Sequence, residues 1–210
     1  FFNLRRMLMN KSFIIKIIVL CLVTIKVYAI EKVVLFGDSL MAGYGLSNEH
    51  HLSVVLKESL IADGFNIEVI NGSVSGSTSA GGLNRAEWTL SESDIDLMIL
   101  GLGANDMLRG INPKETKKNL EQIIKIAQDK SIEVVLAGMV APTSHGFKYK
   151  KNFDKIYPDL SKKYELTLIP FLLEGVALKP KYNLSDGMHP NEKGTIIISN
   201  TLKKAILNKL

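Results

Sequence analysis

Five short apolar runs recur along this chain, and their spacing is the feature that most limits the folds open to it. They occupy residues 33–36, 67–70, 97–102, 134–139 and 166–169. None of them alternates cleanly between apolar and polar residues, as a strand with one face in water would. Such runs are typical of parallel strands that are covered on both faces. We therefore expect a parallel sheet of about five strands.

Amphipathic helical patterns lie between these runs. The clearest has Asn112 as N-cap, Pro113 at the first helical position and Glu115 completing a capping box. Its apolar stripe consists of Leu120, Ile123, Ile124 and Ala127. A closing helix is predicted over residues 192–207. Strands that alternate with helices predict a three-layer α/β/α sandwich, and we see no repeat or linker that would divide it into two domains.

Polar clusters follow four of the apolar runs. They occupy residues 37–39, 71–78, 103–106 and, after a short intervening segment, 185–190. Ligands of open parallel sheets bind outside the carboxyl ends of the strands, where these loops meet. We therefore expect the four clusters to lie at one edge of the sheet and to carry the chemistry.

The clusters contain the three residue types that make a serine nucleophilic. A hydroxyl needs a base to take its proton, and the base needs a third group to orient it. Ser39, His189 and Asp186 supply these types, and the short spacing from Asp186 to His189 suits a turn in which the carboxylate reaches the imidazole. Acyl transfer also needs donors to the developing oxyanion, which the glycine-rich loop 72–76 and Asn105 offer.

Four blocks of this chain resemble the SGNH, or GDSL, hydrolases. They are GDSL at 37–40, VSGST at 74–78, GAND at 103–106 and DGMHP at 186–190. They occur in the family's order and span essentially the whole chain after residue 33. Further similarity at 81–83, 105–110 and 156–174 is strongest to the thioesterase I, lysophospholipase L1 and arylesterase branch. The resemblance implies a flavodoxin-like SGNH fold.

The resemblance also implies the roles of individual residues. Ser39 would be the nucleophile, His189 the general base and then acid, and Asp186 its orienting partner. The oxyanion hole would consist of the backbone N–H groups of Ser39 and Gly76 and the side chain of Asn105. The family needs no metal or cofactor, and no metal-ligand spacing is evident in the chain.

The expected substrates are small acyl esters and thioesters, including aryl esters, acyl-CoA and lysophospholipids. We assign Leu108, Pro142 and Phe147 to the acyl-binding region on the strength of their loops. The loop 141–147 departs from the relatives, which usually carry a Pro-rich, often Asn-containing segment here. That difference leaves the preferred acyl length open. We expect a monomer that contacts membrane lipids only transiently.

The first 29 residues have the composition of a secretory leader. Arg5, Arg6 and Lys11 precede an apolar run at 17–25, and small residues follow. Lys16 shortens that run, so cleavage after Ala29 is favoured over a retained membrane anchor. The chain after the leader contains no cysteine and tolerates an oxidising compartment. We therefore predict a periplasmic or secreted protein whose hydrolase domain spans residues 30–210.

The net charge of +5 comes from this leader. It carries five of the 26 Lys and Arg residues and none of the 21 Asp and Glu residues, so residues 30–210 are balanced at 21 of each. No basic stripe remains to attract a nucleic acid, and no nucleic-acid partner is expected.

Five alternatives remain open at this stage. Ser39 could merely cap a helix, and His145 could compete with His189 as the base. The glycine-rich loops could belong to a nucleotide-binding domain, although neither GxGxxG nor a phosphate-binding loop is complete. The protein could also be a catalytically idle lipid or acyl carrier, or a carbohydrate O-acetylesterase of the same fold.

Overall fold

The computed structural model describes residues 30–91 and 94–210. The predicted leader and its cleavage site after Ala29 lie outside the described residues. In the part of the chain that the structure describes, no helix is long and apolar enough to cross a membrane.

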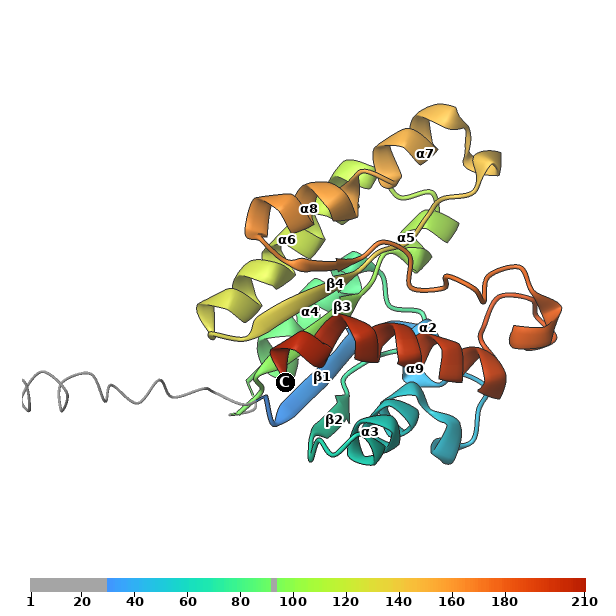
Figure 1. Ribbon diagram of the computed structural model, residues 1–210. Coiled ribbons are helices and arrows are strands. Elements are labelled where there is room, and N and C mark those ends of the chain that lie inside the picture. Colours follow the sequence, from blue (N-terminus) through green and yellow to red (C-terminus); the bar gives the residue numbers. More distant parts are fainter. Residues whose placement is uncertain (1–29, 92–93) are drawn as a thin grey trace, which may run out of the picture.

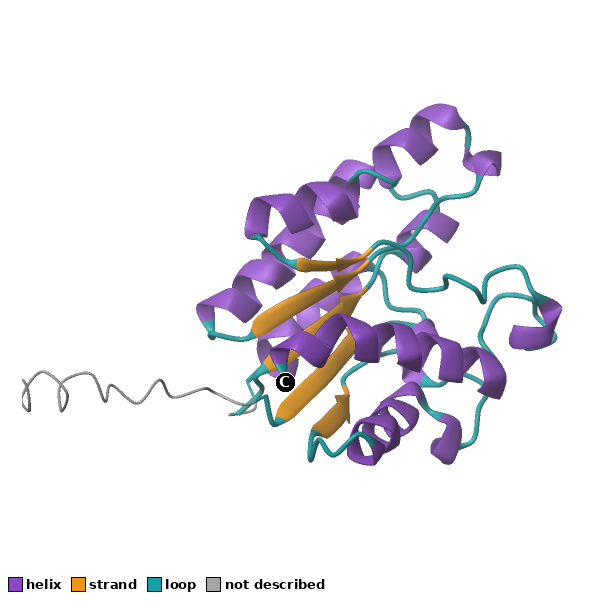
Figure 2. Cartoon of the chain, in the orientation of Figure 1, coloured by secondary structure: helices purple, strands orange, loops and turns teal. Residues whose placement is uncertain are grey.

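A five-stranded parallel sheet forms the centre of the molecule (Figure 2). Its strands are β1 (Lys32–Gly37), β2 (Glu68–Asn71), β3 (Leu97–Gly101), β4 (Glu133–Ala137) and β5 (Thr167–Ile169), in the spatial order β2-β1-β3-β4-β5. β1 and β3 lie in the middle, and every residue of β3 is buried. The order reverses beside β1, which creates the crevice in which such folds bind ligands.

Helices cover both faces of the sheet (Figure 1). α3 (Leu52–Ala62) packs with α9 (Glu192–Ile206) on one face. On the other face α4 (Ser79–Thr89), α6 (Pro113–Asp129) and α8 (Ile156–Tyr164) lie side by side. This arrangement confirms the predicted α/β/α sandwich. Because helices cover both faces of the sheet, its strands do not need to alternate between apolar and polar residues.

The predicted signals set the ends of the longest helix. The Asn112 side chain accepts a hydrogen bond from the Lys114 N–H at 3.1 Å, and Pro113 is the first residue of α6. The predicted stripe of Leu120, Ile123, Ile124 and Ala127 is fully buried. α9 likewise begins where expected, with the Asn191 side chain accepting hydrogen bonds from Lys193 and Gly194.

Short helices gather at the carboxyl ends of the strands. They are α2 (Ser39–Ala42), η1 (Asn48–His50), α5 (Ala104–Leu108), η2 (Thr143–His145), α7 (Phe147–Phe153) and η3 (Pro180–Tyr182); η4 (Leu207–Lys209) closes the chain at the other end. Because α2 and α5 begin within three residues of the ends of β1 and β3, the strands fix the positions of their first side chains. The loops of this edge therefore sit on a rigid support.

Candidate active site

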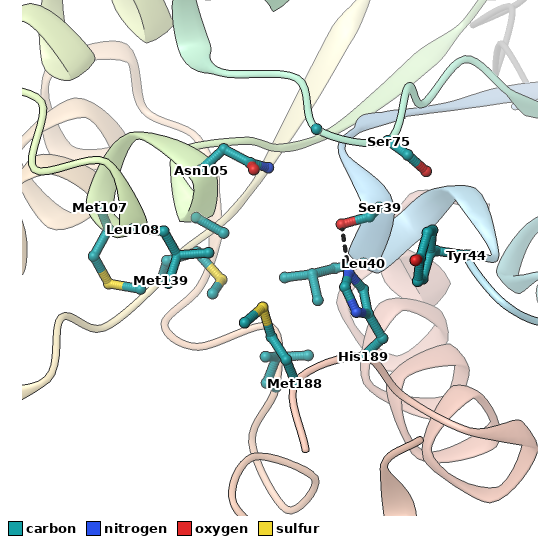
Figure 3. Close-up of a pocket in the computed structure, with 13 residues that line it drawn as sticks. Ser39, Leu40, Tyr44, Ser75, Asn105, Met107, Leu108, Met139, Met188 and His189 are labelled. Atoms are coloured by element: carbon teal, nitrogen blue, oxygen red, sulfur yellow. Dashed lines mark hydrogen bonds between the residues drawn. The ribbon is translucent and has the colours of Figure 1, made fainter. Parts of the chain in front are cut away.

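Ser39 is the first residue of α2, immediately beyond the central strand β1. The cap of this helix is Asp38, whose carboxylate accepts the Leu40 N–H at 3.1 Å. Capping therefore does not account for Ser39, whose side chain faces the open edge of the sheet (Figure 3). The turn is tight, because a Cβ atom at Gly37 would lie 2.9 Å from the carbonyl oxygen of Gly101.

His189 lies 150 positions further along the chain and contacts Ser39 directly. Its Nε2 is 2.9 Å from Ser39 Oγ, the contact drawn in Figure 3, and its Nδ1 is 2.6 Å from Asp186 Oδ2. The three side chains thus form an unbroken chain from hydroxyl to imidazole to carboxylate. This is the arrangement that lets an imidazole take a proton from a serine.

The turn at 186–189 holds Asp186 in its ionised form. Its Oδ1 accepts the backbone N–H groups of His189 at 3.0 Å and Met188 at 2.8 Å. These two bonds, with the one to the His189 ring, lower the pKa of Asp186 from 3.8 to about 2. Gly187 completes the turn at a φ of 71°, a conformation that glycine adopts without strain.

The side chains of Asn183 and Asn191 anchor this turn to the body of the domain. Asn183 is buried and donates to the carbonyl of Val176 at 2.8 Å. Asn191 donates to the Asn183 carbonyl at 3.1 Å while its own oxygen caps α9. The backbone of Leu184 donates to the His189 carbonyl at 2.8 Å. The loop that carries Asp186 and His189 is therefore tied to the start of α9.

Gly76 and Asn105 border the same cavity as Ser39 and His189. Gly76 has a φ of 78°, a left-handed conformation that residues other than glycine rarely adopt. Arg109 donates to the Gly76 carbonyl at 3.1 Å. The Asn105 side chain donates to Asp38 Oδ2 at 3.2 Å and points toward Ser39 (Figure 3).

Asp38 is only 1% exposed. Burial raises its pKa from 3.8 to about 6, although the hydrogen bonds from Leu40 and Asn105 act in the opposite direction. Arg85 fixes the strand ends nearby, donating to the carbonyls of Gly72 at 2.6 Å and Gly37 at 3.0 Å. Burial lowers the pKa of the Arg85 guanidinium.

Asp106 connects two of the polar loops beneath the cavity. It is fully buried and accepts the Ser79 N–H at 2.7 Å, the Ser79 hydroxyl, and the Thr116 hydroxyl at 3.1 Å. Asn119 also donates to the Ser79 hydroxyl, at 3.0 Å. This network holds the start of α4 to α5 and α6, so the loops that carry Gly76 and Asn105 are fixed relative to each other.

The cavity has a volume of about 330 Å³ and a largely apolar lining. Its apolar side chains are Leu40, Ala104, Met107, Leu108, Met139, Leu173 and Met188. The rings of Tyr44 and His189, which both line the cavity, have centroids 4.4 Å apart and are tilted by 36°. Such a space, with polar groups only at the end beside Ser39, suits an acyl chain whose carbonyl reaches the hydroxyl.

The structure separates the three residues assigned to acyl binding. Leu108 lines the cavity and is half exposed. Pro142 and Phe147 lie on the segment that follows β4, and neither belongs to the lining. Phe147 instead projects into solvent and is 82% exposed.

From the sequence we assigned no role to the supporting residues Tyr44, Arg85, Asp106 and Asn183. Asp106 follows Asn105 in the same short motif, so its position could have indicated a role. Arg85 had no such signal, because its partners are backbone carbonyls at distant strand ends. Within residues 30–91 and 94–210, no three His, Cys, Asp or Glu side chains are placed to hold a metal ion.

Comparison with known proteins finds a family model and several esterases that are similar to this chain. Residues 35–195 match the model of the GDSL-like lipase/acylhydrolase family. An arylesterase of Vibrio mimicus is 36% identical over 182 residues, which cover 87% of this chain and 91% of the relative. The thioesterase 1/protease 1/lysophospholipase L1 of Escherichia coli is 33% identical, with 89% and 88% covered. A solved esterase of the SGNH-hydrolase family is 40% identical, with a TM-score of 0.72 and 86% and 96% covered.

Proposed function

The chain belongs to the GDSL-like lipase/acylhydrolase family and is a serine esterase of SGNH type, and we propose that it cleaves acyl esters and thioesters through an acyl-enzyme on Ser39. The observation that carries this proposal is the unbroken contact from Ser39 through His189 to Asp186, at 2.9 and 2.6 Å. Each distance lies within hydrogen-bonding range.

In the proposed first step Ser39 Oγ attacks the acyl carbonyl while His189 Nε2 takes the hydroxyl proton. The tetrahedral oxyanion accepts hydrogen bonds from the backbone of Ser39 and Gly76 and from the Asn105 amide. His189 then returns the proton to the leaving alkoxide or thiolate, which departs as an alcohol or thiol. Water attacks the acyl-enzyme by the same route, releases the carboxylic acid and restores Ser39.

Asp186 has a defined part in both steps. Its carboxylate accepts from Nδ1, which leaves Nε2 unprotonated toward Ser39 and stabilises the positive charge that forms on the ring. Because its pKa is about 2, the carboxylate of Asp186 stays charged at neutral pH.

The substrate class follows from the cavity and the relatives. The apolar lining would hold an acyl chain, and the relatives are named as an arylesterase and a thioesterase/lysophospholipase. We assign aryl esters, acyl-CoA and lysophospholipids to this chain on that basis. Acetyl groups on carbohydrates would leave most of the 330 Å³ unfilled.

We further propose that residues 1–29 are a secretory signal, and that the hydrolase domain spans residues 30–210 and acts in the periplasm or outside the cell as a monomer. The buried side chain of Ile30, which belongs to the core, supports a domain that begins there. The intact mass of the protein after export tests cleavage after Ala29, and light scattering tests the monomer.

The experiment for the proposed activity compares a p-nitrophenyl ester series, from acetyl to palmitoyl, with wild type and Ser39→Ala. We expect Ser39-dependent hydrolysis with an optimum at medium or long chains. Hydrolysis confined to acetyl esters would move the function to carbohydrate deacetylation. Failure to cleave any ester would favour an acyl-binding protein without turnover.

A further inference from the structure

Exposed apolar side chains concentrate around the entrance of the cavity. Among residues 30–91 and 94–210, eleven large apolar side chains are exposed. Seven of them lie on the loops or short helices that follow the carboxyl ends of the strands, namely Tyr44, Val74, Leu108, Val140, Phe147, Leu178 and Met188. Each of the five strands is followed by at least one of these residues. Most of the exposed large apolar side chains of the described residues therefore lie on the carboxyl edge of the sheet.

Two of these side chains protrude the most. Phe147, at the start of α7, is 82% exposed, and Leu178, just before η3, is 92% exposed. Both α7 and the segment that leads to α9 extend beyond the sheet at the same end of the molecule (Figure 1). Leu178 also has a φ of 61°, a conformation that leucine rarely adopts. No buried contact of its side chain explains why it is held there.

Basic residues accompany the protruding side chains. Lys148 and Lys151 follow Phe147 on α7, and Lys179 and Lys181 follow Leu178; all four are exposed. Glu174 and Asp186 are the exposed carboxylates in that second segment, and Asp186 is paired with His189. Residues 30–210 have no net charge, so the basic character of this edge is local.

We propose that this edge docks on an anionic phospholipid surface with Phe147 and Leu178 inserted between the lipids. Apolar tips that are ringed by lysines fit an interface of acyl chains beneath negatively charged headgroups. A protein partner on the same face would close the entrance of the cavity, whereas a lipid surface would place acyl chains at it. Docking would thus bring lipid substrates to Ser39 without passage through water.

The molecule provides matched controls at the opposite edge. The long helices run back from the carboxyl to the amino ends of the strands, so the last turns of α3, α4 and α9 lie on the side opposite the loops that follow the carboxyl ends (Figure 1). Trp88 there is 81% exposed, against 82% for Phe147, and Ile61 is 50% exposed. Lys204 is an exposed lysine near the end of α9.

The test measures cosedimentation with lipid vesicles in a Ser39→Ala background, so that it does not depend on the proposed hydrolysis. The vesicles are phosphatidylcholine with or without about 30% phosphatidylglycerol. All variants retain residues 1–29, so any contribution of that segment is the same in each. Circular dichroism confirms that each variant is folded.

We expect binding to the anionic vesicles that weakens with salt, and a loss of about tenfold or more for Phe147→Ser with Leu178→Ser. Trp88→Ser with Ile61→Ser should change binding less than about twofold, as should Lys204→Glu. Lys148→Glu with Lys151→Glu should abolish the preference for anionic vesicles without removing any apolar side chain. An unchanged affinity in both carboxyl-edge pairs, an equal loss in the controls, or no binding by the parent protein would overturn the proposal.

Discussion

The side-chain amide of Asn105 donates one hydrogen bond to the buried carboxylate of Asp38, at 3.2 Å. This bond fixes the plane of the amide, and the Asn105 side chain points toward Ser39 (Figure 3). Asp38 is in turn held by the Leu40 N–H at the start of α2. The helix that presents the serine and the amide that faces it are thus joined through one carboxylate.

Loss of the Asn105 amide should slow the reaction without unfolding the protein. We expect Asn105→Ala to lower kcat on a p-nitrophenyl ester by about a hundredfold or more, because one oxyanion donor is removed. Steady-state kinetics measure the effect. Asn84→Ala, an exposed position on α4, is the matched control and should keep its kcat. Wild-type turnover in Asn105→Ala would place the donors elsewhere.

The raised pKa of Asp38 makes part of the stability depend on pH. Well below pH 3.8 its carboxyl is protonated in both the folded and the unfolded chain. The pKa is 3.8 in the unfolded chain and about 6 in the folded chain, so between these values the folded chain keeps a proton that the unfolded chain has lost. The free energy of unfolding therefore falls as pH rises, until the folded carboxyl also ionises near pH 6. Above that, the buried charge costs about 3 kcal/mol relative to the protonated form.

Asp38→Asn should remove this dependence. Urea unfolding of wild type and Asp38→Asn from pH 4 to pH 7 measures it as the difference in unfolding free energy. Relative to the variant, wild type should lose about 2.4 kcal/mol as pH rises over that interval, since all other groups titrate in both proteins. If the free energy of unfolding had the same pH dependence in both proteins, Asp38 would ionise as it does in water.

Asp106 should matter mainly for stability. Asp106→Ala leaves the Ser79 N–H and two hydroxyls without their buried acceptor, and we expect the free energy of unfolding to fall by about 3 kcal/mol or more. Asp129→Ala removes an exposed carboxylate at the end of α6 and should change it by less than about 0.5 kcal/mol. Equal effects in urea titrations of the two variants would argue against the network.

Leu108 should influence which acyl chains are accepted. Leu108→Trp adds bulk to the lining of the 330 Å³ cavity, so the optimum in kcat/KM should move to shorter esters. Ile196→Trp, on α9, is the control because Ile196 is 51% exposed and Leu108 is 50% exposed. An unchanged chain-length profile in Leu108→Trp would place the acyl chain outside this cavity.

The sequence predicted best what depends on local pattern. The cap, first-turn proline and stripe of α6 lie where the pattern puts them, because capping and periodicity act within one segment. The parallel order of the sheet explains why Ser39 and His189 meet, since the ends of parallel strands share one edge.

Features that depend on packing between distant segments could not be predicted in this way. The hydrogen bonds of Arg85 to Gly37 and Gly72 join three separate segments, and no local pattern marks them. Phe147 was assigned to acyl binding because its loop follows a strand near the site. The position of α7 turns that side chain into solvent, which no spacing in the sequence indicates.

The most direct test of the central claim is labelling with a fluorophosphonate, followed by mass spectrometry of the peptides. The account predicts one adduct per chain, on Ser39, with labelling that is greatly slowed in His189→Ala because the hydroxyl then lacks its base. Ester hydrolysis should disappear as the adduct forms. Adduct formation on another residue, or complete hydrolysis by protein in which Ser39 is fully labelled, would contradict it.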